Sequence, residues 1–150
     1  TFDAWLSRNS NKKSTLRSWF ASLGEQIVEV RVEGETRYLL AEHEDELAAT
    51  RPSRATHLLG AFDQFVLGPG TKDTHMLAHE HRPLVSKAAG WIAPVLTQGG
   101  RITGVWEMDD GNLVVTPFPG EQAPPSQVLE DAAARLTAVH GSVKVTPRVD

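Results

Sequence analysis

The chain has 150 residues, 40% of them hydrophobic, so it is long and apolar enough to bury a core in one domain or two small ones, and intrinsic disorder is excluded. Its formal net charge of −4 excludes a strongly basic protein that binds nucleic acid over its whole surface. Cysteine is absent and no apolar run approaches the roughly 20 residues of a membrane span, so we expect a cytoplasmic protein without disulfides, thiolate chemistry or a membrane partner.

The first third of the chain predicts two helices followed by a two-stranded hairpin. In the second helix, apolar residues recur at positions i, i+3, i+4 and i+7, which predicts one buried stripe made of Leu16, Trp19, Phe20 and Leu23. Apolar and polar residues alternate over 27–32 and 36–40, on either side of a turn at 33–35, as in a half-buried hairpin. A short acidic helix is expected over residues 42–49.

Helix, turn, helix and hairpin in this order are typical of the C-terminal part of a winged-helix domain. In such a domain the second helix enters the major groove of DNA and the hairpin lies along the backbone. The cations that would reach phosphates are Lys12, Lys13, Arg17, Arg31 and Arg37. A solvated charged surface and a protein-interaction module stay open as alternatives, since glutamates on the same hairpin would repel DNA.

A second group of candidate functional residues lies between residues 57 and 107. Asp63 stands among aromatic and aliphatic residues, where its carboxylate has two possible roles. It could stabilise a sugar cation or orient a water during base excision, or it could be a structural carboxylate that caps a turn or pairs with an arginine. Lys72, Arg82 and Lys87 would hold phosphates if they faced a DNA channel, and otherwise are scattered surface charges.

The same stretch contains a histidine cluster and two tryptophans. His75, His79 and His81 have the spacing of a zinc site if they lie on a helix, but the neighbouring prolines and glycines favour exposed loop histidines and no bound metal. Trp91 and Trp106 are expected to be core residues, with stacking on an exposed base as the alternative.

The last third predicts an antiparallel meander and one helix. Residues 91–97, 101–108 and 113–118 read as consecutive strands because both connections contain residues that accept positive φ. Ile102, Gly104 and Trp106 are expected to share one face, with Gly104 at a bulge or a close contact. A helix from Ser126 and a strand over 143–148 follow.

These elements predict an α+β chain with two parts. The last part of a winged helix is expected over residues 1–57, and an antiparallel β-meander domain packed with one helix over residues 58–150. The chain begins at Thr1 with a helix already under way, so we expect a fragment of a longer protein.

Three ordered sequence blocks resemble the C-terminal half of one bacterial family. The blocks are LLGAFDQFVLG (58–68), GWIAPVL (90–96) and GRITGVWE (100–107). The family is that of the tandem winged-helix DNA-binding proteins, which include the DNA glycosylases that unhook interstrand crosslinks and confer azinomycin resistance. The resemblance covers nearly the whole chain, and the hairpin-bearing segment takes the place of the family's last winged helix.

The resemblance implies a longer parent protein in which several winged helices and a C-terminal β domain surround a DNA-binding channel. The family's catalytic signature, two glutamines separated by one apolar residue, belongs to its N-terminal part, and every glutamine of this chain is isolated: Gln26, Gln64, Gln98, Gln122 and Gln127. We therefore expect a fragment that contributes DNA-binding contacts and shapes part of the channel, and that is catalytically inert alone. No cofactor is implied; the partners would be double-stranded DNA, intact or damaged, and the missing N-terminal domains of the same chain.

Two other functions stay open at this point. A winged-helix transcription regulator would use the same elements for sequence-specific binding without enzymatic activity. A non-catalytic protein-interaction module is favoured by the net negative charge.

Overall fold

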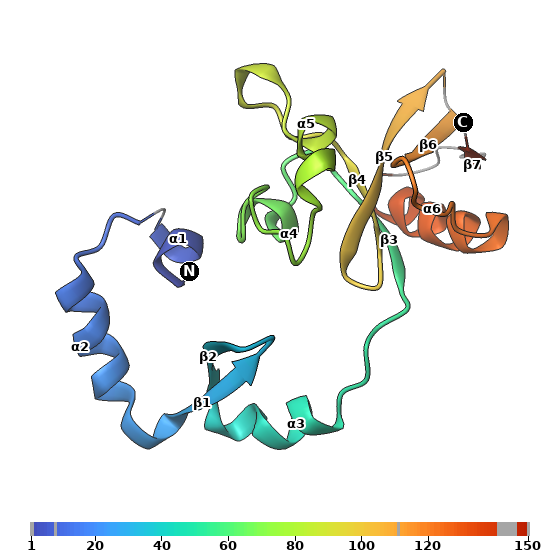
Figure 1. Cartoon of the computed structure of the whole chain (residues 1–150). Coiled ribbons are helices and arrows are strands. Elements are labelled where there is room, and N and C mark those ends of the chain that lie inside the picture. The colour runs from blue at the N-terminus through green and yellow to red at the C-terminus, as the bar shows by residue number, and fades with distance from the viewer. Residues whose placement is uncertain (1, 8, 111, 141–146, 150) are drawn as a thin grey trace. The chain divides into compact units, whose positions relative to one another are not determined.

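The chain is organised as two compact units, Thr1–Pro52 and Ser53–Asp150, which we call the N-terminal unit and the C-terminal unit. A computed structural model describes residues 2–7, 9–110, 112–140 and 147–149, and Figure 1 shows their helices and strands. The division falls before residue 57 because Thr56 and His57 already belong to a strand of the C-terminal unit. None of the described helices has the length and apolar character needed to cross a membrane.

The N-terminal unit contains the expected helices and hairpin. Helices α1 (Phe2–Ser7) and α2 (Lys13–Leu23) are followed by the antiparallel strands β1 (Ile27–Val32) and β2 (Glu35–Leu40), and then by helix α3 (Glu44–Ala49). Short 3-10 turns, η1 (Gly24–Gln26) and η2 (Ala41–His43), flank the hairpin. The two-residue turn between the strands, residues 33 and 34, has positive φ at both positions, as a tight hairpin requires.

The apolar side chains of α2 lie near the surface. The prediction of a buried stripe on α2 is wrong: Trp19 is 43% exposed, and Leu16, Phe20 and Leu23 are only half-buried. Phe20 instead makes edge-to-face ring contacts with Phe2 and Tyr38. The physical reason is that two short helices and a two-stranded hairpin offer too little apolar surface to cover the stripe.

The C-terminal unit is built on a five-stranded sheet with the order β3-β4-β5-β6-β7. Its strands are β3 (Thr56–Leu59), β4 (Val95–Gln98), β5 (Arg101–Asp109), β6 (Asn112–Pro117) and β7 (Pro147–Val149). Strands β3 to β6 pair antiparallel, and β7 pairs parallel to β6. The β4-β5-β6 meander confirms the sequence prediction, whereas β3 extends the sheet on its other side; residues 143–146 lie outside the described part.

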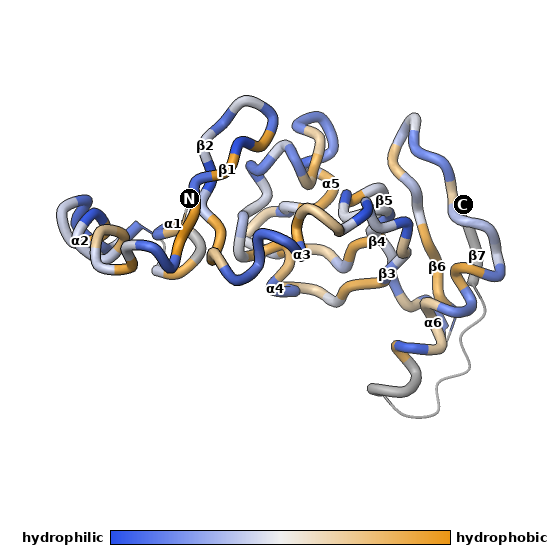
Figure 2. The backbone as a smooth tube through the Cα atoms, turned by 90° about the horizontal axis from the view of Figure 1, so that it is seen from below, coloured by the Kyte–Doolittle hydropathy of each residue, from blue (hydrophilic) through white to orange (hydrophobic). Residues whose placement is uncertain are grey.

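Both faces of this sheet are covered. Helix α6 (Ser126–His140) covers one face, and the segment with the short helices α4 (Gln64–Leu67) and α5 (Arg82–Val85) covers the other (Figures 1 and 2). The cluster beneath α6 consists of Leu58, Leu96, Leu113, Val115, Leu129, Ala132 and Ala133. The cluster on the other face consists of Val66, Met76, Leu77, Val85, Ile92, Val95, Ile102 and Phe118. The second layer, which also holds the 3-10 turns η3 (His79–His81) and η4 (Ala88–Gly90), was not expected from the sequence.

A bulge in β5 changes which side chains share a face. Thr97 pairs with Ile102 and the preceding Leu96 pairs with Gly104, so β5 carries one extra residue at this point. Ile102 therefore packs on the face of α4 and α5, while Trp106 packs on the face of α6. The prediction that both residues share one face is wrong because a bulge interrupts the two-residue alternation of a strand.

Candidate nucleic-acid interface

The start of α2 carries three exposed cations. Lys12 is the N-cap residue, and Lys13 and Arg17 are four residues apart, on one face of the helix. The cap position has no side-chain hydrogen bond and the first turn contains no acidic residue. Unsatisfied backbone N–H groups and cations therefore coincide at the positive end of the helix, which favours an anionic partner. Among the described residues, no ion pair involves any of these three side chains.

The hairpin offers a weaker cationic surface than the sequence suggested. Arg31 is exposed on β1, but the guanidinium of Arg37 on β2 forms an ion pair with Glu35. Glu29 on β1 accepts a hydrogen bond from the Thr36 hydroxyl at 3.4 Å. These carboxylates place negative charge beside both arginines.

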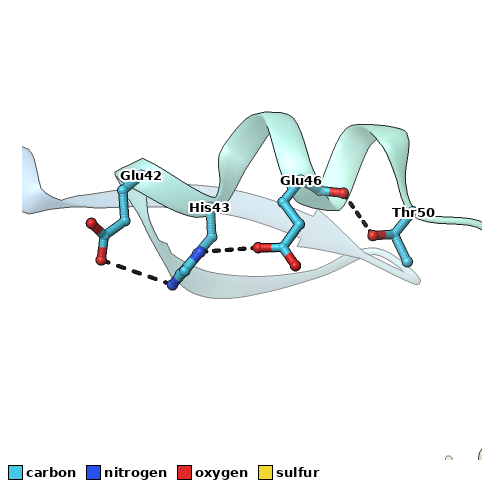
Figure 3. Close-up of polar contacts among 4 residues, drawn as sticks. All are labelled: Glu42, His43, Glu46 and Thr50. Atoms are coloured by element: carbon cyan, nitrogen blue, oxygen red, sulfur yellow. Dashed lines mark hydrogen bonds and ion pairs between the residues drawn. The ribbon is translucent and has the colours of Figure 1, made fainter.

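The acidic segment after the hairpin is exposed, and its polar side chains contact one another. Figure 3 shows the imidazole of His43 between two carboxylates, with Glu46 at 3.1 Å from Nδ1 and Glu42 at 3.8 Å from Nε2. The hydroxyl of Thr50 donates to the Glu46 carbonyl at 2.6 Å and closes the C-terminal end of α3 (Figure 3). This segment would repel DNA rather than bind it.

In the C-terminal unit, two of the predicted cations line one small recess. The recess has a volume of about 200 Å³ and is lined by Thr71, Lys72, Thr74, Leu77, His79 and Arg82. Arg82 is oriented by a hydrogen bond from its Nε to the Thr71 hydroxyl at 3.2 Å. The third predicted cation, Lys87, lies in a different groove beside Trp91.

Local turn chemistry brings these residues together. Asp73 Oδ1 accepts a hydrogen bond from the His75 N–H at 2.9 Å, and the Asp73 carbonyl accepts another from the Leu77 N–H at 3.0 Å. The buried side chains of Met76 and Leu77 then anchor the loop in the core. The loop is thus a fixed scaffold for the side chains at the recess.

Asp63 has a structural partner. It is the N-cap of α4, and its Oδ1 accepts a hydrogen bond from the Phe65 N–H at 2.8 Å. This contact matches the structural alternative considered from the sequence. The catalytic assignment of Asp63 stays a prediction.

The three histidines of the predicted cluster have different surroundings. His81 is buried, and its ring lies 4.6 Å from that of Phe118, whereas His75 and His79 are exposed. The segment forms turns and the 3-10 turn η3 rather than one helix, so His75 and His79 do not share the helix face on which the zinc hypothesis depended. Within the described ranges, no group of three or more His, Asp or Glu side chains could hold a metal ion.

The two candidate tryptophans also differ. Trp106 is half-buried, and its indole N–H donates to the Leu59 carbonyl at 2.9 Å, as expected for a core residue. The expectation of a core residue is wrong for Trp91, which is 52% exposed and makes an edge-to-face contact with Phe62. Sequence reasoning missed Phe62, because only its position in a tight turn makes it a surface residue.

Comparisons with known proteins agree with the sequence resemblance. The model of the family "DNA glycosylase AlkZ-like" matches residues 2–139. An interstrand DNA cross-link repair glycosylase of Streptomyces sahachiroi is 50% identical over 149 residues, which are 99% of this chain and 40% of that protein. The solved structure of the Streptomyces sahachiroi DNA glycosylase AlkZ matches with a TM-score of 0.94 at 50% identity, again over 99% of this chain and 40% of the other. The chain thus spans 40% of the length of the relative it matches, and it belongs to the family of AlkZ-like DNA glycosylases.

Proposed function

We propose that this chain is the DNA-gripping part of a glycosylase that repairs interstrand crosslinks in the bacterial cytoplasm. The relative from Streptomyces sahachiroi is named as an interstrand DNA cross-link repair glycosylase and is similar to this chain over nearly all of its length. In the whole protein, the reaction would be hydrolysis of the N-glycosidic bond of an alkylated purine, with water as nucleophile. The two glutamines that the family's signature requires would come from other parts of that protein.

The recess around Lys72 and Arg82 carries this proposal. A phosphate needs a positive charge and several hydrogen-bond donors that converge on one point. The recess brings together an ammonium, a guanidinium and two hydroxyl groups, and the Thr71 contact leaves the terminal guanidinium N–H groups of Arg82 available. Among the residues that the structure describes, no carboxylate lines it and none forms an ion pair with Lys72 or Arg82.

The α2 cations give the N-terminal unit a second contact with the backbone in this proposal. Helices α1 and α2 and the hairpin would be the C-terminal part of a winged helix, with Lys12, Lys13 and Arg17 facing phosphates. The ion-paired Arg37 would contribute less than the exposed Arg31. The acidic residues of the hairpin and α3 favour a second candidate, a protein-contact role for this unit.

A salt series tests the proposal. Binding of this chain to a labelled duplex is measured by fluorescence anisotropy at increasing salt concentration, for the wild type and for Lys72→Ala, Arg82→Ala and Arg101→Ala. If each recess cation neutralises one phosphate, its removal lowers the slope of log affinity against log salt by about 1. Arg101→Ala removes an exposed cation outside the recess and serves as the matched control.

Three results would separate the alternatives. Absence of salt-dependent binding in the wild type would contradict the DNA-binding function altogether. If the slopes of Lys72→Ala and Arg82→Ala equalled that of the wild type, the recess would not be part of the DNA interface. An unchanged slope in the triple variant Lys12→Ala/Lys13→Ala/Arg17→Ala would favour the protein-contact role of the N-terminal unit.

A further inference from the structure

Phe62 and Trp91 form an aromatic pair at the surface of the C-terminal unit. Their ring centroids are 5.0 Å apart and their planes are inclined by 85°, so that the two rings meet edge to face. Trp91 is 52% exposed and Phe62 is 43% exposed. When a ligand covers a large apolar ring that is half exposed, apolar surface is removed from water, and this burial favours binding.

Both rings are held by turns in an unusual backbone conformation. Phe62 has a φ of 58°, and Ala89 has a φ of 56° two residues before Trp91. Bulky L-residues rarely adopt such angles, and they persist where the surrounding contacts impose them. Around Phe62 these contacts are the Asp63 N–H bond to the Gly60 carbonyl and the Asp63 cap of α4.

Backbone hydrogen bonds fix Trp91 in a similar way. Its N–H donates to the Ala88 carbonyl at 3.2 Å, and its carbonyl accepts from the Lys87 N–H at 2.8 Å. Its indole N–H has no hydrogen-bond partner among the described residues, in contrast to that of Trp106. The backbone of Trp91 is thus fixed by hydrogen bonds and its ring is held against Phe62, which lowers the entropy lost on binding a ligand.

Trp91 also lines a groove of about 510 Å³, a volume within the range of ligand sites. Its lining includes Leu84, Lys87, Pro94, Trp106, Glu107 and Met108. An aromatic face and an apolar floor suit a nucleobase, and the groove carries one cation, Lys87, for the attached phosphate and one carboxylate, Glu107. Helix α5 contributes to this groove through Leu84 and to the phosphate recess through Arg82, so one element serves both sites.

We propose that Trp91, braced by Phe62, stacks on a nucleobase that has left the DNA helix, while Lys87 contacts the adjoining phosphate. A base inside a duplex presents only its edges, so an exposed indole can stack on its face only where the base is unstacked. The inference rests on the DNA-binding function proposed above. It specifies that this surface recognises an unstacked nucleobase and the adjoining phosphate.

Two duplexes that differ by one unpaired adenine provide the test, both at the same fixed salt concentration. Stacking by one aromatic residue corresponds to an affinity ratio of about 5- to 160-fold. Trp91→Ala should weaken binding of the duplex with the unpaired base by this factor and leave binding of the fully paired duplex unchanged. Trp91→Phe keeps an aromatic face and should retain most of the preference. Phe65→Ala removes another 43% exposed ring, which makes no ring contact with a described residue, and should have no effect.

Tryptophan fluorescence gives a second readout that does not depend on an alanine variant. The unpaired adenine should quench part of the emission of the wild type but not of Trp91→Phe. A wild type without preference, an equal loss on both duplexes in Trp91→Ala, or an equal loss in Phe65→Ala would overturn the inference. If salt-dependent binding to the paired duplex persists in that case, the proposed function stands; if neither duplex binds at all, both fail.

Discussion

The carboxylate of Asp3 ties α1 to the chain that leads into α2. It accepts hydrogen bonds from the Ser7 hydroxyl at 2.5 Å and from the Asn11 amide at 2.7 Å. These bonds, with that from Ser7 the largest cause, lower the pKa of Asp3 below its ordinary value. A carboxylate whose pKa is depressed on folding stabilises the folded state above its unfolded pKa, and this stabilisation is lost as the pH falls through the folded pKa.

We therefore expect the helical signal of the chain to decrease below about pH 4, where carboxylates begin to be protonated. Circular dichroism of the wild type and Asp3→Asn across an acid titration measures this, because the difference between the two profiles isolates Asp3. The variant should be less helical at neutral pH and lose less on acidification. Glu25→Gln removes an exposed carboxylate from the same unit and is the control. Superimposable profiles for wild type and Asp3→Asn would contradict the stabilising role of this carboxylate.

Gly104 lies where β6 leaves no room for a side chain. A Cβ at this position would meet the Thr116 carbonyl oxygen at 2.6 Å and the Pro117 Cα at 3.0 Å, and both are backbone atoms. Gly104→Ala should therefore lower the free energy of unfolding by about 1–3 kcal/mol, the usual cost of overpacking. Chemical denaturation measures the change, with Gly60→Ala as control because nothing lies within 4 Å of its added Cβ. Equal stability of the two variants would mean that the sheet relaxes around the extra methyl group.

At the scale of elements, α4 depends on Asp63 for its start. The helix has four residues, so the cap bond from the Phe65 N–H is a large part of its hydrogen bonding. Asp63→Ala should lower the free energy of unfolding by about 0.5–2 kcal/mol, whereas Asp63→Asn keeps an accepting oxygen and should be close to wild type. Thermal unfolding compares the two. An equally destabilised Asp63→Asn would show that the charge, not the cap, is what α4 needs.

Strongly periodic elements could be predicted from the sequence. The hairpin in the N-terminal unit, the β4-β5-β6 meander and helix α6 all have repeating apolar positions that directly encode their secondary structure. Strand β3 has only four residues, and the layer of α4 and α5 buries Val66, Met76, Leu77 and Val85 from turns and single helical turns. Their spacing has no period, so only tertiary contact shows that they form a core.

At the scale of the whole chain, the candidate site could be predicted only in part. The sequence supplied Lys72 and Arg82 as cations, and the turns between them place both at one recess with the Thr71 hydroxyl. It could not show that Arg37 is ion-paired or that Trp91 is exposed while Trp106 is not. These properties depend on which neighbour each side chain finds after folding. Charge and residue type alone do not specify that neighbour.

The two units should differ in local stability. The C-terminal unit has two buried clusters, one on each face of its sheet, whereas in the N-terminal unit none of the hydrophobic side chains that the structure describes, which do not include Trp5, is buried. Local opening costs little free energy where few apolar contacts are lost. We therefore expect the amides of β1 and β2 to exchange with solvent much faster than those of β4 and β5, although both strand pairs have antiparallel hydrogen bonds.

Hydrogen exchange followed by mass spectrometry would test this difference on the intact chain, with and without a DNA duplex. Equal protection of the two hairpins in the free chain would contradict the prediction. Added duplex should slow exchange in the loop before α5, where the recess lies, because bound phosphate restrains the segment that carries Lys72 and Arg82. Slower exchange in α2 as well would place its cations on the DNA, and protection confined to the C-terminal unit would leave the N-terminal unit for a protein partner.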